Sequence, residues 1–349
     1  MIAEESSSSE IWKEYKDSGL TGLANLGNTC FINSAIQCLS HTYEFSKFLD
    51  KDYKKKLNKI PDTLIFIEWD KLRKLMWSEN CIIQPNGFLS SVHKVARIKD
   101  IEIFTGYAQN DLTEFLQFCI DCFHNSIKRE VEMKINGSIK NGTDKIASEC
   151  YRMMKNMYKK EYSEIINMFY GIHVSKVKSL ESDYLNLTPE PFFNIMLPIS
   201  QNKTLEGSFE LYATTEKMTG ENKIFNEETN KKEDAEKTLL FWSLPNILIV
   251  TLKRFSANLR KNQDLVDFPL ENLDLRKYVI GYDKKSYVYD LYGICNHSGN
   301  VMGGHYTSFV KNANGKWYHF NDTSVSQVKN LSSLKSNKAY CFFYRKKSM

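Results

Sequence analysis

The sequence places a cysteine and a histidine near opposite ends of the chain, each inside a dense polar motif. Cys30 follows the turn-forming residues 27–29, and His305 follows two glycines. An asparagine and an aspartate, Asn321 and Asp322, come sixteen and seventeen residues after the histidine. A thiol, an imidazole and a carboxamide or carboxylate are the parts of a triad for nucleophilic catalysis. Such parts are often brought together from distant positions by the fold.

Cys30 is the candidate nucleophile because of its local sequence. Apolar residues between positions 31 and 39 recur at helical spacing, and Asn28 or Thr29 can cap the helix that they predict. We therefore expect Cys30 in the first helical turn, where the positive end of the helix and an adjacent imidazole lower the pKa of a thiol. A buried structural cysteine is the common alternative. Asn25 is a candidate donor to an oxyanion, although an asparagine there is also an ordinary turn residue.

His305 is the candidate general base. The glycines at positions 303–304 would let a substrate backbone approach closely. One of the two residues at positions 321–322 would hydrogen-bond the imidazole and fix its tautomer. His297 and His319 are competitors, but His297 has no polar partner at a similar spacing, and we expect His319 to lie on the other strand face from the neighbours of Asn321.

The composition is that of a folded, soluble protein. The chain has 349 residues, of which 42% are hydrophobic and 13% aromatic, so it can bury a sizeable core. The 47 basic and 42 acidic residues give a net charge of only +5 without a long basic block, so no nucleic-acid partner is predicted. No apolar run approaches 18 residues, so no membrane span is expected.

The eight cysteines are best interpreted as free thiols. The chain opens with polar residues rather than an apolar signal segment, which favours a reducing, intracellular location, cytoplasmic or nuclear. Cys119 and Cys122 form a Cys-x-x-Cys pair inside an apolar helical pattern from about 110 to 123, for which Asn110 is a plausible cap. Because the pair has no second pair beside it, no structural zinc site is predicted there.

Helical patterns dominate the first half of the chain and strand patterns the second, which predicts an α+β fold. Residues 247–252 form a continuous apolar run, typical of a buried strand. Further strand patterns rich in aromatic and β-branched residues follow, at 287–295, 305–310, 316–320 and 339–344. Residues 215–237 are charged and are predicted to form an exposed hairpin or loop.

Five ordered segments resemble the ubiquitin-specific proteases, which are papain-like cysteine deubiquitinases. Residues 22–34 resemble the cysteine box of that family, and residues 109–116 its Gln-Gln-Asp-x-x-Glu-Phe-Leu box. Residues 252–255 and 266–269 match its central strands, residues 292–322 its histidine box, and residues from 339 its last strand. Five boxes in order, between about residues 19 and 347, are far more specific than any single motif.

The resemblance implies a papain-like α+β architecture with thumb, palm and fingers, in which the fingers would hold the globular body of ubiquitin. After a flexible segment 1–18, a catalytic domain would span 19–349, with a thumb at about 19–190, fingers at about 191–245 and a palm at about 246–349. The resemblance implies that Cys30 is the nucleophile, His305 the base and Asn321 the third triad member. Asn25 and Asp322 would support the oxyanion. The channel for the C-terminal tail of ubiquitin would be lined by Gln109, Asp111, Phe255, Gly304 and Tyr306.

One departure from the family concerns metal. Many members hold the tips of the fingers with zinc through two Cys-x-x-Cys pairs, whereas the matching positions here are Ser179, Ser182, Asn226 and Thr229. Hydroxyls and amides are poor zinc ligands compared with thiolates, so we expect neither a metal nor any other cofactor. A second departure, Asn110 in place of Gln or His, is minor.

The resemblance implies a thiol-dependent deubiquitinase that acts on ubiquitin and ubiquitinated proteins, and we expect a monomer. Two alternatives stay open. One is a protease of a ubiquitin-like modifier, whose tail shares the Gly-Gly end. The other is a non-catalytic ubiquitin-binding module, which the presence of Cys30, His305 and Asn321 argues against.

Overall fold

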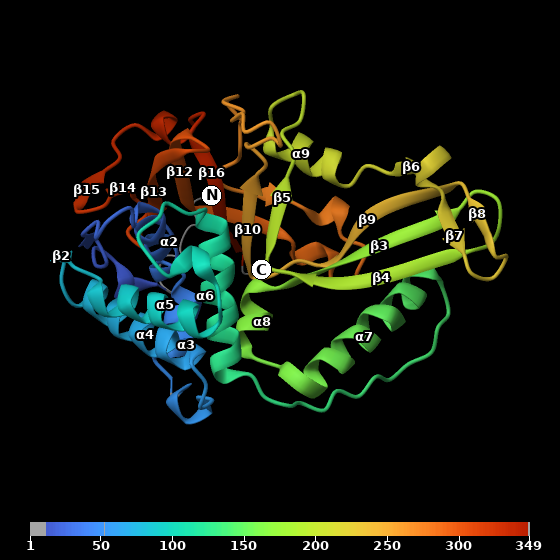
Figure 1. The fold of residues 1–349 in the computed structure, drawn as a ribbon, viewed down its shortest axis with the longest axis horizontal. Helices are drawn as coiled ribbons and strands as arrows, with labels where there is room; N and C mark the ends of the chain where they lie inside the picture. The colour runs from blue at the N-terminus through green and yellow to red at the C-terminus, as the bar shows by residue number, and fades with distance from the viewer. Residues whose placement is uncertain (1–11, 52, 348–349) are drawn as a thin grey trace, which may run out of the picture.

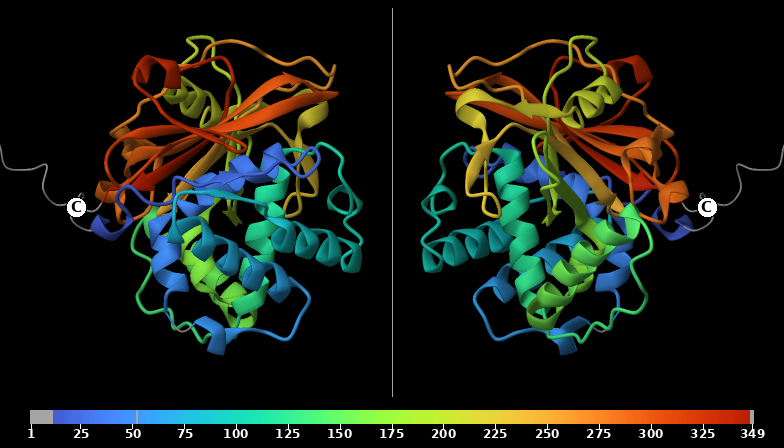
Figure 2. Two further views of the ribbon diagram at one scale, coloured as in Figure 1. Left: turned by 90° about the vertical axis from the view of Figure 1, so that its left-hand side faces the viewer. Right: turned by 90° about the vertical axis from the view of Figure 1, so that its right-hand side faces the viewer.

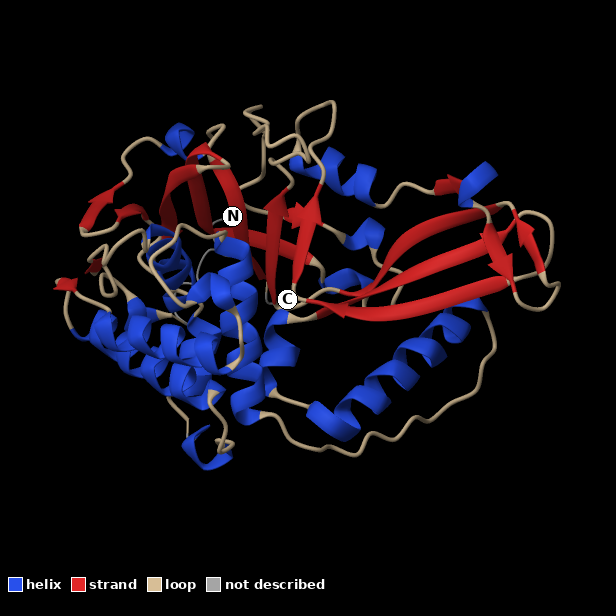
Figure 3. Ribbon diagram, in the orientation of Figure 1, coloured by secondary structure: helices blue, strands red, loops and turns tan. Residues whose placement is uncertain are grey.

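The computed structural model describes residues 12–51 and 53–347, so residues 1–11 of the segment predicted to be flexible lie outside the described part. Most helices gather in one region and the strands form separate sheets, with α7 and α9 beside the sheets (Figures 1 and 3), which confirms the predicted α+β class. Seen from either end, the large sheet lies over the helices (Figure 2). A second, longer sheet extends away from both.

The helical region contains most of the helices of the described chain. Their bounds are α2 Cys30–Ser40, α3 Tyr43–Leu49, α4 Asp62–Ser78, α5 Asn86–Ile98, α6 Leu112–Ile127 and α8 Glu164–Phe169, with 3-10 turns η1 Lys13–Tyr15, η2 Tyr53–Lys56 and η3 Glu102–Phe104. The two-residue strands β1 Gly22–Leu23 and β2 Ile82–Ile83 pair in parallel. Every residue of α2 is buried, because this helix lies between α6 and the large sheet. The helix that carries Cys30 is therefore held rigidly on all sides.

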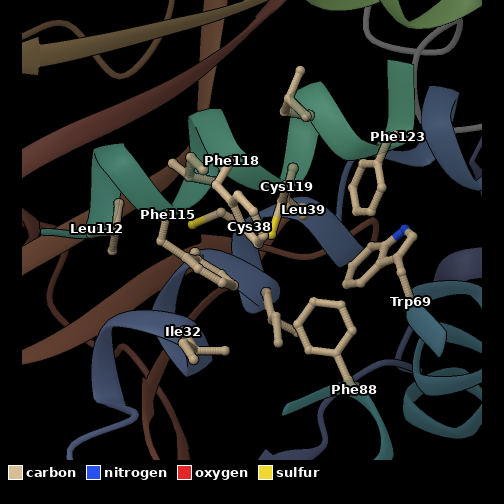
Figure 4. Packing of buried hydrophobic residues seen from close by; sticks show 14 of the residues in the cluster. Ile32, Cys38, Leu39, Trp69, Phe88, Leu112, Phe115, Phe118, Cys119 and Phe123 are labelled. Atoms are coloured by element: carbon tan, nitrogen blue, oxygen red, sulfur yellow. The ribbon is translucent and has the colours of Figure 1, made fainter. Parts of the chain in front are cut away.

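The core of the helical region is built around α6 (Figure 4). Its predicted apolar stripe is buried as expected, with a relative exposure of 0% for Leu112, Phe115, Leu116, Cys119 and Phe123. These side chains pack against residues of α2, α4 and α5, including Cys38, Leu39, Trp69 and Phe88. Full burial of one such side chain contributes about 1.5–3 kcal/mol relative to exposure, so this core fixes the position of α6 against α2.

The large sheet carries the strands predicted from the second half of the sequence. Its order is β15-β14-β13-β12-β16-β10-β5, and β11 pairs with β12 beside this path. The bounds are β5 Asn194–Leu197, β10 Ile247–Leu252, β11 Leu273–Asp274, β12 Val288–Asn300, β13 Gly303–Lys311, β14 Trp317–Asn321, β15 Ser324–Gln327 and β16 Ala339–Lys346. Strand β10 has the predicted bounds and is entirely buried, since it lies between β16 and the parallel strand β5.

The prediction of central strands at 252–255 and 266–269 is wrong beyond Leu252. Strand β10 ends there, and Phe255 forms only an isolated bridge with Lys261. Asp267 forms an isolated bridge with Thr204. The chain between these points is a loop on the surface of the large sheet, and it connects to the turns η5 Arg276–Tyr278 and η6 Lys284–Ser286. A further turn, η7 Leu331–Leu334, precedes β16.

The second sheet, which we call the fingers sheet, has the order β4-β3-β9-β6. Its strands are β3 Gly171–Ser179, β4 Leu185–Phe192, β6 Glu216–Met218 and β9 Ala235–Ser243, and a small hairpin of β7 Ile224–Asn226 and β8 Lys231–Glu233 lies at its far end. Helix α7 Gly142–Glu161 packs against it through Ala147 and Cys150, while α9 Leu205–Tyr212 and η4 Gly220–Asn222 lie between β5 and β7 in the chain. The fingers sheet thus begins at residue 171, whereas the sequence predicted a boundary near 190.

Residues 12–18 are packed, although the sequence predicted a flexible segment there. The ring of Tyr15 is 7% exposed and stacks on Tyr43 at 4.6 Å between centroids. The amide of Asp17 donates to Asn312 Oδ1 at 3.1 Å. The prediction rested on the polar residues of the segment and gave no weight to its two aromatic residues, Trp12 and Tyr15. Large aromatic side chains are usually buried, so these two could have predicted the packing.

Candidate active site

Cys30 is the first residue of α2 and is 3% exposed. The loop before it turns sharply, with φ of +105° at Gly27 and +54° at Asn28, values that glycine and asparagine tolerate best. The Asn28 side chain donates to the carbonyl of Tyr107 at 3.0 Å and so ties this loop to the segment before α6. Thr29 occupies the N-cap position, but its Oγ1 accepts from the Leu26 amide at 2.9 Å instead of capping the helix.

The environment of the Cys30 thiol differs from the sequence-based prediction. Burial raises the pKa of the thiol, and this effect exceeds the lowering by hydrogen bonds from the backbone of Tyr306 and of the helix start. The negative charge of Asp322 also raises this pKa. The prediction of a lowered thiol pKa is therefore wrong for the free protein, because it considered the helix terminus and not the desolvation of a buried sulfur.

His305 and Asn321 are brought together by neighbouring strands. His305 lies on β13 and Asn321 is the last residue of β14, which pairs antiparallel with β13. The ring nitrogen Nε2 of His305 lies 2.7 Å from Asn321 Oδ1. Because an amide oxygen only accepts, this hydrogen bond places the proton on Nε2 and leaves Nδ1 as the basic nitrogen.

Asp322 faces the opposite way, toward the loop of residues 24–29 that precedes Cys30, which we call the nucleophile loop. Its backbone is in the left-handed region, with φ of 49°. Its Oδ2 accepts from Asn25 Nδ2 at 3.0 Å and its Oδ1 accepts from Asn33 Nδ2 at 2.8 Å, while its carbonyl accepts from the Leu23 amide at 2.9 Å. Sequence reasoning missed Asn33, whose signal was a polar side chain on a buried helix one turn after the cysteine.

Asn25 holds the nucleophile loop in place through both the oxygen and the nitrogen of its side-chain amide. Its Oδ1 accepts from the backbone amides of Gly27 and Thr29, each at 3.1 Å. Its Nδ2 donates to Asp322, as described above. An amide nitrogen carries two N–H groups, so this arrangement leaves one N–H for another acceptor. Asn25 can therefore stabilise the turn through its Oδ1 and still donate to an oxyanion through its Nδ2, the two roles that the sequence left open.

The two competing histidines have other partners. His297 is buried, and Lys261 donates to its Nδ1 at 3.0 Å and to its carbonyl oxygen at 2.6 Å. Burial, with the neighbouring lysine, lowers the pKa of His297 to about 4. The His319 ring packs on Phe309 at 4.8 Å between centroids, and burial lowers its pKa as well. Sequence reasoning missed the Lys261 contact, which joins positions 36 residues apart.

A groove of about 320 Å³ runs beside the His305 strand. It is lined by Gln109, Asn110, Asp111, Glu114, Phe255, His297, Asn300, Val301, Gly303, Gly304 and Tyr306. All five residues predicted to bind a substrate tail are thus brought together. A larger cavity of about 670 Å³ lies between α6 and α7, and Glu114 borders both spaces.

Gly304 and Gln109 face each other across this groove. The Gly304 amide donates to Gln109 Oε1 at 2.7 Å, and Gln109 Nε2 donates to the Gly304 carbonyl at 3.0 Å. A Cβ atom at position 304 would lie only 2.3 Å from His297 Nε2, so no other residue fits there without displacement. Gly304 therefore packs directly against the His297 ring, and the Gln109 side chain is hydrogen-bonded to its backbone beside the groove.

Asp111 is engaged at both carboxylate oxygens. It is the N-cap of α6, where Oδ1 accepts from the Thr113 and Glu114 amides at 2.8 and 3.2 Å and also from the Thr113 hydroxyl. The cap is therefore Asp111, whereas the sequence predicted Asn110. The Tyr340 hydroxyl donates to Oδ2 at 2.6 Å, which links α6 to the last strand of the large sheet.

The structure describes no group of three or more His, Cys, Asp or Glu side chains positioned to hold a metal ion within residues 12–51 and 53–347. All eight cysteines are free thiols. Cys119 and Cys122 are buried in α6, and burial raises the pKa of both. In the same described part of the chain, no helix has the length and apolar character needed to span a membrane.

Comparison with known proteins agrees with this geometry. A family model described as "Ubiquitin carboxyl-terminal hydrolase" matches residues 21–344. The chain belongs to the ubiquitin carboxyl-terminal hydrolase family. The match contains every element described above, from β1 to β16, except the last residues of β16.

Curated relatives and solved structures of this hydrolase family are similar over nearly the whole chain. Ubiquitin carboxyl-terminal hydrolase 2 of Bos taurus is 33% identical over 340 residues, covering 93% of this chain and 55% of the relative, and the Drosophila melanogaster enzyme Usp2 is 30% identical over 344 residues. The chain thus spans about half the length of the mammalian relative. The SAGA Ubp8/Sgf11/Sus1/Sgf73 DUB module bound to ubiquitin aldehyde matches with a TM-score of 0.73 and 26% identity, covering 96% of this chain and 71% of that chain.

Proposed function

We propose that this chain is a thiol-dependent deubiquitinase that hydrolyses the isopeptide or peptide bond after the C-terminal glycine of ubiquitin. The observation that carries the proposal is the groove beside Gly304, which brings together all five residues predicted to bind the tail and adjoins the strand of the His305–Asn321 pair. A tail that ends in two glycines suits such a groove. A solved structure with a TM-score of 0.73 holds ubiquitin aldehyde, which supports ubiquitin as the partner.

In the proposed acylation step, Cys30 attacks the carbonyl carbon of the terminal glycine. Nδ1 of His305 accepts the thiol proton as the sulfur–carbon bond forms, while Asn321 holds the ring through Nε2. The free N–H of Asn25 stabilises the oxyanion, and Asp322 holds that amide in place. His305 then gives the proton to the lysine nitrogen, which leaves as the amine when its bond to the carbonyl carbon breaks.

In the proposed deacylation step, water attacks the thioester between Cys30 and ubiquitin. His305 takes one proton from the water and gives it to the sulfur as the carbon–sulfur bond breaks, which regenerates the free thiol. The carboxylic acid formed at the C-terminus of ubiquitin loses the second proton to solvent and leaves as the carboxylate. Asn321 holds the orientation and the tautomer of the His305 ring, and it neither takes up nor releases a proton itself. No metal or cofactor takes part in these steps.

The test is reaction with a ubiquitin probe that carries a C-terminal electrophile, compared with matched SUMO and NEDD8 probes. We expect a covalent adduct with the ubiquitin probe at Cys30, and no adduct in a Cys30→Ala variant. Cys30→Ala should keep its affinity for ubiquitin, whereas Cys81→Ala, a partly exposed cysteine away from α2, should react normally. A preference for a ubiquitin-like probe would favour the modifier protease, and binding without reaction would favour the non-catalytic module.

Two further properties are part of the proposal. We infer that the chain acts as a monomer on ubiquitinated proteins. We also infer a reducing cytoplasmic or nuclear location, which the eight free cysteines support. Size-exclusion chromatography with light scattering tests the first property, and fractionation of cells that express the protein tests the second.

A further inference from the structure

Two turns meet at the far end of the fingers sheet (Figure 1). One is the turn between β3 and β4, at residues 180–184, and the other joins β7 to β8 at residues 227–230. Large apolar side chains here point outward, since Leu180 and Phe225 are 52% and 54% exposed. Apolar packing is therefore a weak source of stability at this tip, and polar contacts must hold the two turns together.

The contacts converge on one carboxylate. Glu233, the last residue of β8, is 3% exposed. Its Oε2 accepts from the hydroxyls of Ser179 and Ser182 at 2.6 and 2.7 Å, and its Oε1 accepts from Asn226 Nδ2 and the Thr229 hydroxyl at 2.9 and 2.6 Å. We call these five residues the fingertip cluster. Two of its four donors, Ser182 and Thr229, lie in the turns, and the other two end the strands that lead into them. The one carboxylate accepts from all four.

The donors of the fingertip cluster also fix the backbone of each turn. The Ser182 amide donates to Ser179 Oγ at 3.1 Å, and the Glu228 amide donates to Asn226 Oδ1 at 2.9 Å. Loss of the central carboxylate would therefore release the side chains that shape both turns. These four positions are the ones at which sequence analysis found no thiolate donors, and the residue at their centre was not foreseen.

The charge of Glu233 is stabilised where it lies. The hydrogen bonds, those from the two serines first, lower the pKa of Glu233 to about 2, so the carboxylate is ionised throughout the neutral range. Three other charged groups at the tip pair with one another and not with Glu233, since Lys223 Nζ lies 3.3 Å from Asp234 and 3.5 Å from Glu181. A hydrogen-bonded anion of this kind is a strong, directional link.

We propose that Glu233 is a positioning residue for substrate recognition, because its carboxylate ties the two turns of the fingers together without a metal ion and so keeps the fingers sheet in shape for the globular body of ubiquitin. This inference rests on the proposed function for its substrate. The fingertip cluster lies at the opposite end of the molecule from α2 (Figure 1), so its loss should change binding and not the chemistry at Cys30.

The kinetic test compares Glu233→Gln with Glu228→Gln, an exposed glutamate in the same hairpin. Glutamine keeps the size of the side chain, but its NH₂ group faces hydrogen-bond donors that need an acceptor. We expect KM for a ubiquitin-based substrate to rise roughly tenfold in Glu233→Gln with kcat unchanged, and Glu228→Gln to behave as wild type. Cleavage of a short peptide substrate ending in Gly-Gly, which does not reach the fingers, should be the same in all three proteins.

The structural test is hydrogen exchange of residues 179–184 and 226–233, which does not depend on activity. Exchange there should be faster in Glu233→Gln, with the helical region unchanged. Thr229→Val removes one donor from an exposed position and should give a smaller change of the same kind, even if Glu233→Gln does not fold. Unchanged exchange and KM in a folded Glu233→Gln protein, or one tightly held zinc per chain in wild type, would overturn the proposal. Wild type that does not cleave ubiquitin would refute the proposed function, while the exchange measurement would still test the cluster.

Discussion

Burial and the helix N-terminus act in opposite directions on the Cys30 thiol, and burial has the larger effect. The free protein is therefore expected to hold a neutral thiol that transfers its proton during attack, and not a preformed thiolate. The Cys30 thiol of the free protein should therefore react slowly with small oxidants and alkylating agents, because the thiol is buried and little thiolate is present.

The pH dependence of alkylation tests this state. Because the pKa of the Cys30 thiol is raised, the thiolate fraction is small at neutral pH and grows as the pH rises. The rate of iodoacetamide modification at Cys30, followed by mass spectrometry, should climb continuously from pH 6 to above pH 9. The partly exposed Cys81 serves as the internal control. A plateau for Cys30 below pH 8 would instead indicate a thiolate–imidazolium pair in the free protein.

Asn321 should act on His305 and not on the fold. Removal of its side chain leaves Nε2 of His305 without the acceptor at 2.7 Å, so the orientation of the ring is no longer fixed. We expect Asn321→Ala to lower kcat roughly 10- to 100-fold, with little change in KM or melting temperature. Ser326→Ala, an exposed position on β15, is the control. A loss confined to KM would assign Asn321 to substrate binding.

At the scale of elements, the start of α6 has two roles that the sequence could not separate. Asp111 caps the helix and accepts from Tyr340, and it also lines the groove. Loss of the cap costs about 1 kcal/mol, and a buried Tyr340 hydroxyl left without its acceptor costs about 1–3 kcal/mol. Asp111→Ala should therefore lower the melting temperature as well as the activity, which is more than the sequence alone implied.

Asp111→Asn separates the two roles, since asparagine is also a good N-cap but carries no charge. We propose that Asp111 pairs with an arginine of the ubiquitin tail, and then Asp111→Asn should raise KM several-fold with a smaller effect on stability. A double-mutant cycle with a ubiquitin whose tail arginines are replaced measures the contact directly. Simple addition of the two losses would show that Asp111 serves only the helix.

The loop that follows β10 is anchored to the strand opposite His305. Strand β12 pairs with β16 only as far as Asn296, and just beyond that point Lys261 donates to the carbonyl and ring of His297. The next residue of β12, Ser298, pairs with His305. Lys261 thus satisfies the His297 carbonyl just beyond the last β12–β16 pair, and it also fixes the His297 ring, which lies against Gly304.

Lys261→Met should weaken this anchor and lower kcat/KM roughly tenfold, whereas Lys253→Met, an exposed neighbour, should have little effect. Burial lowers the pKa of Lys261 to about 8 and that of His297 to about 4. The charged lysine and the neutral ring therefore coexist between about pH 4 and pH 8. The ratio of wild-type to variant activity should be constant from pH 5 to 7.5 and fall above pH 8. A ratio that does not depend on pH would show that the charge of Lys261 is irrelevant.

At the scale of the molecule, sequence patterns predicted the elements that bury continuous apolar surface. The stripe of α6 and the run of β10 are examples, because their periodicity records which face is buried. The patterns failed where polar side chains meet across long separations. Glu233 with the two fingertip turns, Lys261 with His297, and Asn33 with Asp322 each join segments whose composition is that of ordinary surface loops.

The longest stretch at which structure and sequence-based prediction differ is the segment at residues 12–18, which was predicted to be flexible and is packed. It lies across the junction of the helical region and the large sheet, where Tyr15 stacks on Tyr43 and meets the Trp77 ring at 5.2 Å. Arg345 of β16 lies over the rings of Trp12 and Tyr43, at 5.5 and 4.8 Å from their centroids. The segment therefore links the first helices to the last strand and acts as a strap on the body that carries Cys30 and His305.

Tyr15→Ala tests this strap. The side chain is 7% exposed, and removal of a buried aromatic ring costs about 3 kcal/mol. We expect the melting temperature to fall by several degrees, with kcat unchanged at low temperature, because the ring touches neither the groove nor the nucleophile loop. Lys16→Ala, an exposed neighbour, should melt as wild type does. Equal melting of Tyr15→Ala and wild type would mean that the segment does not stay on the body in solution, and that the flexible N-terminal segment predicted from sequence extends to residue 18.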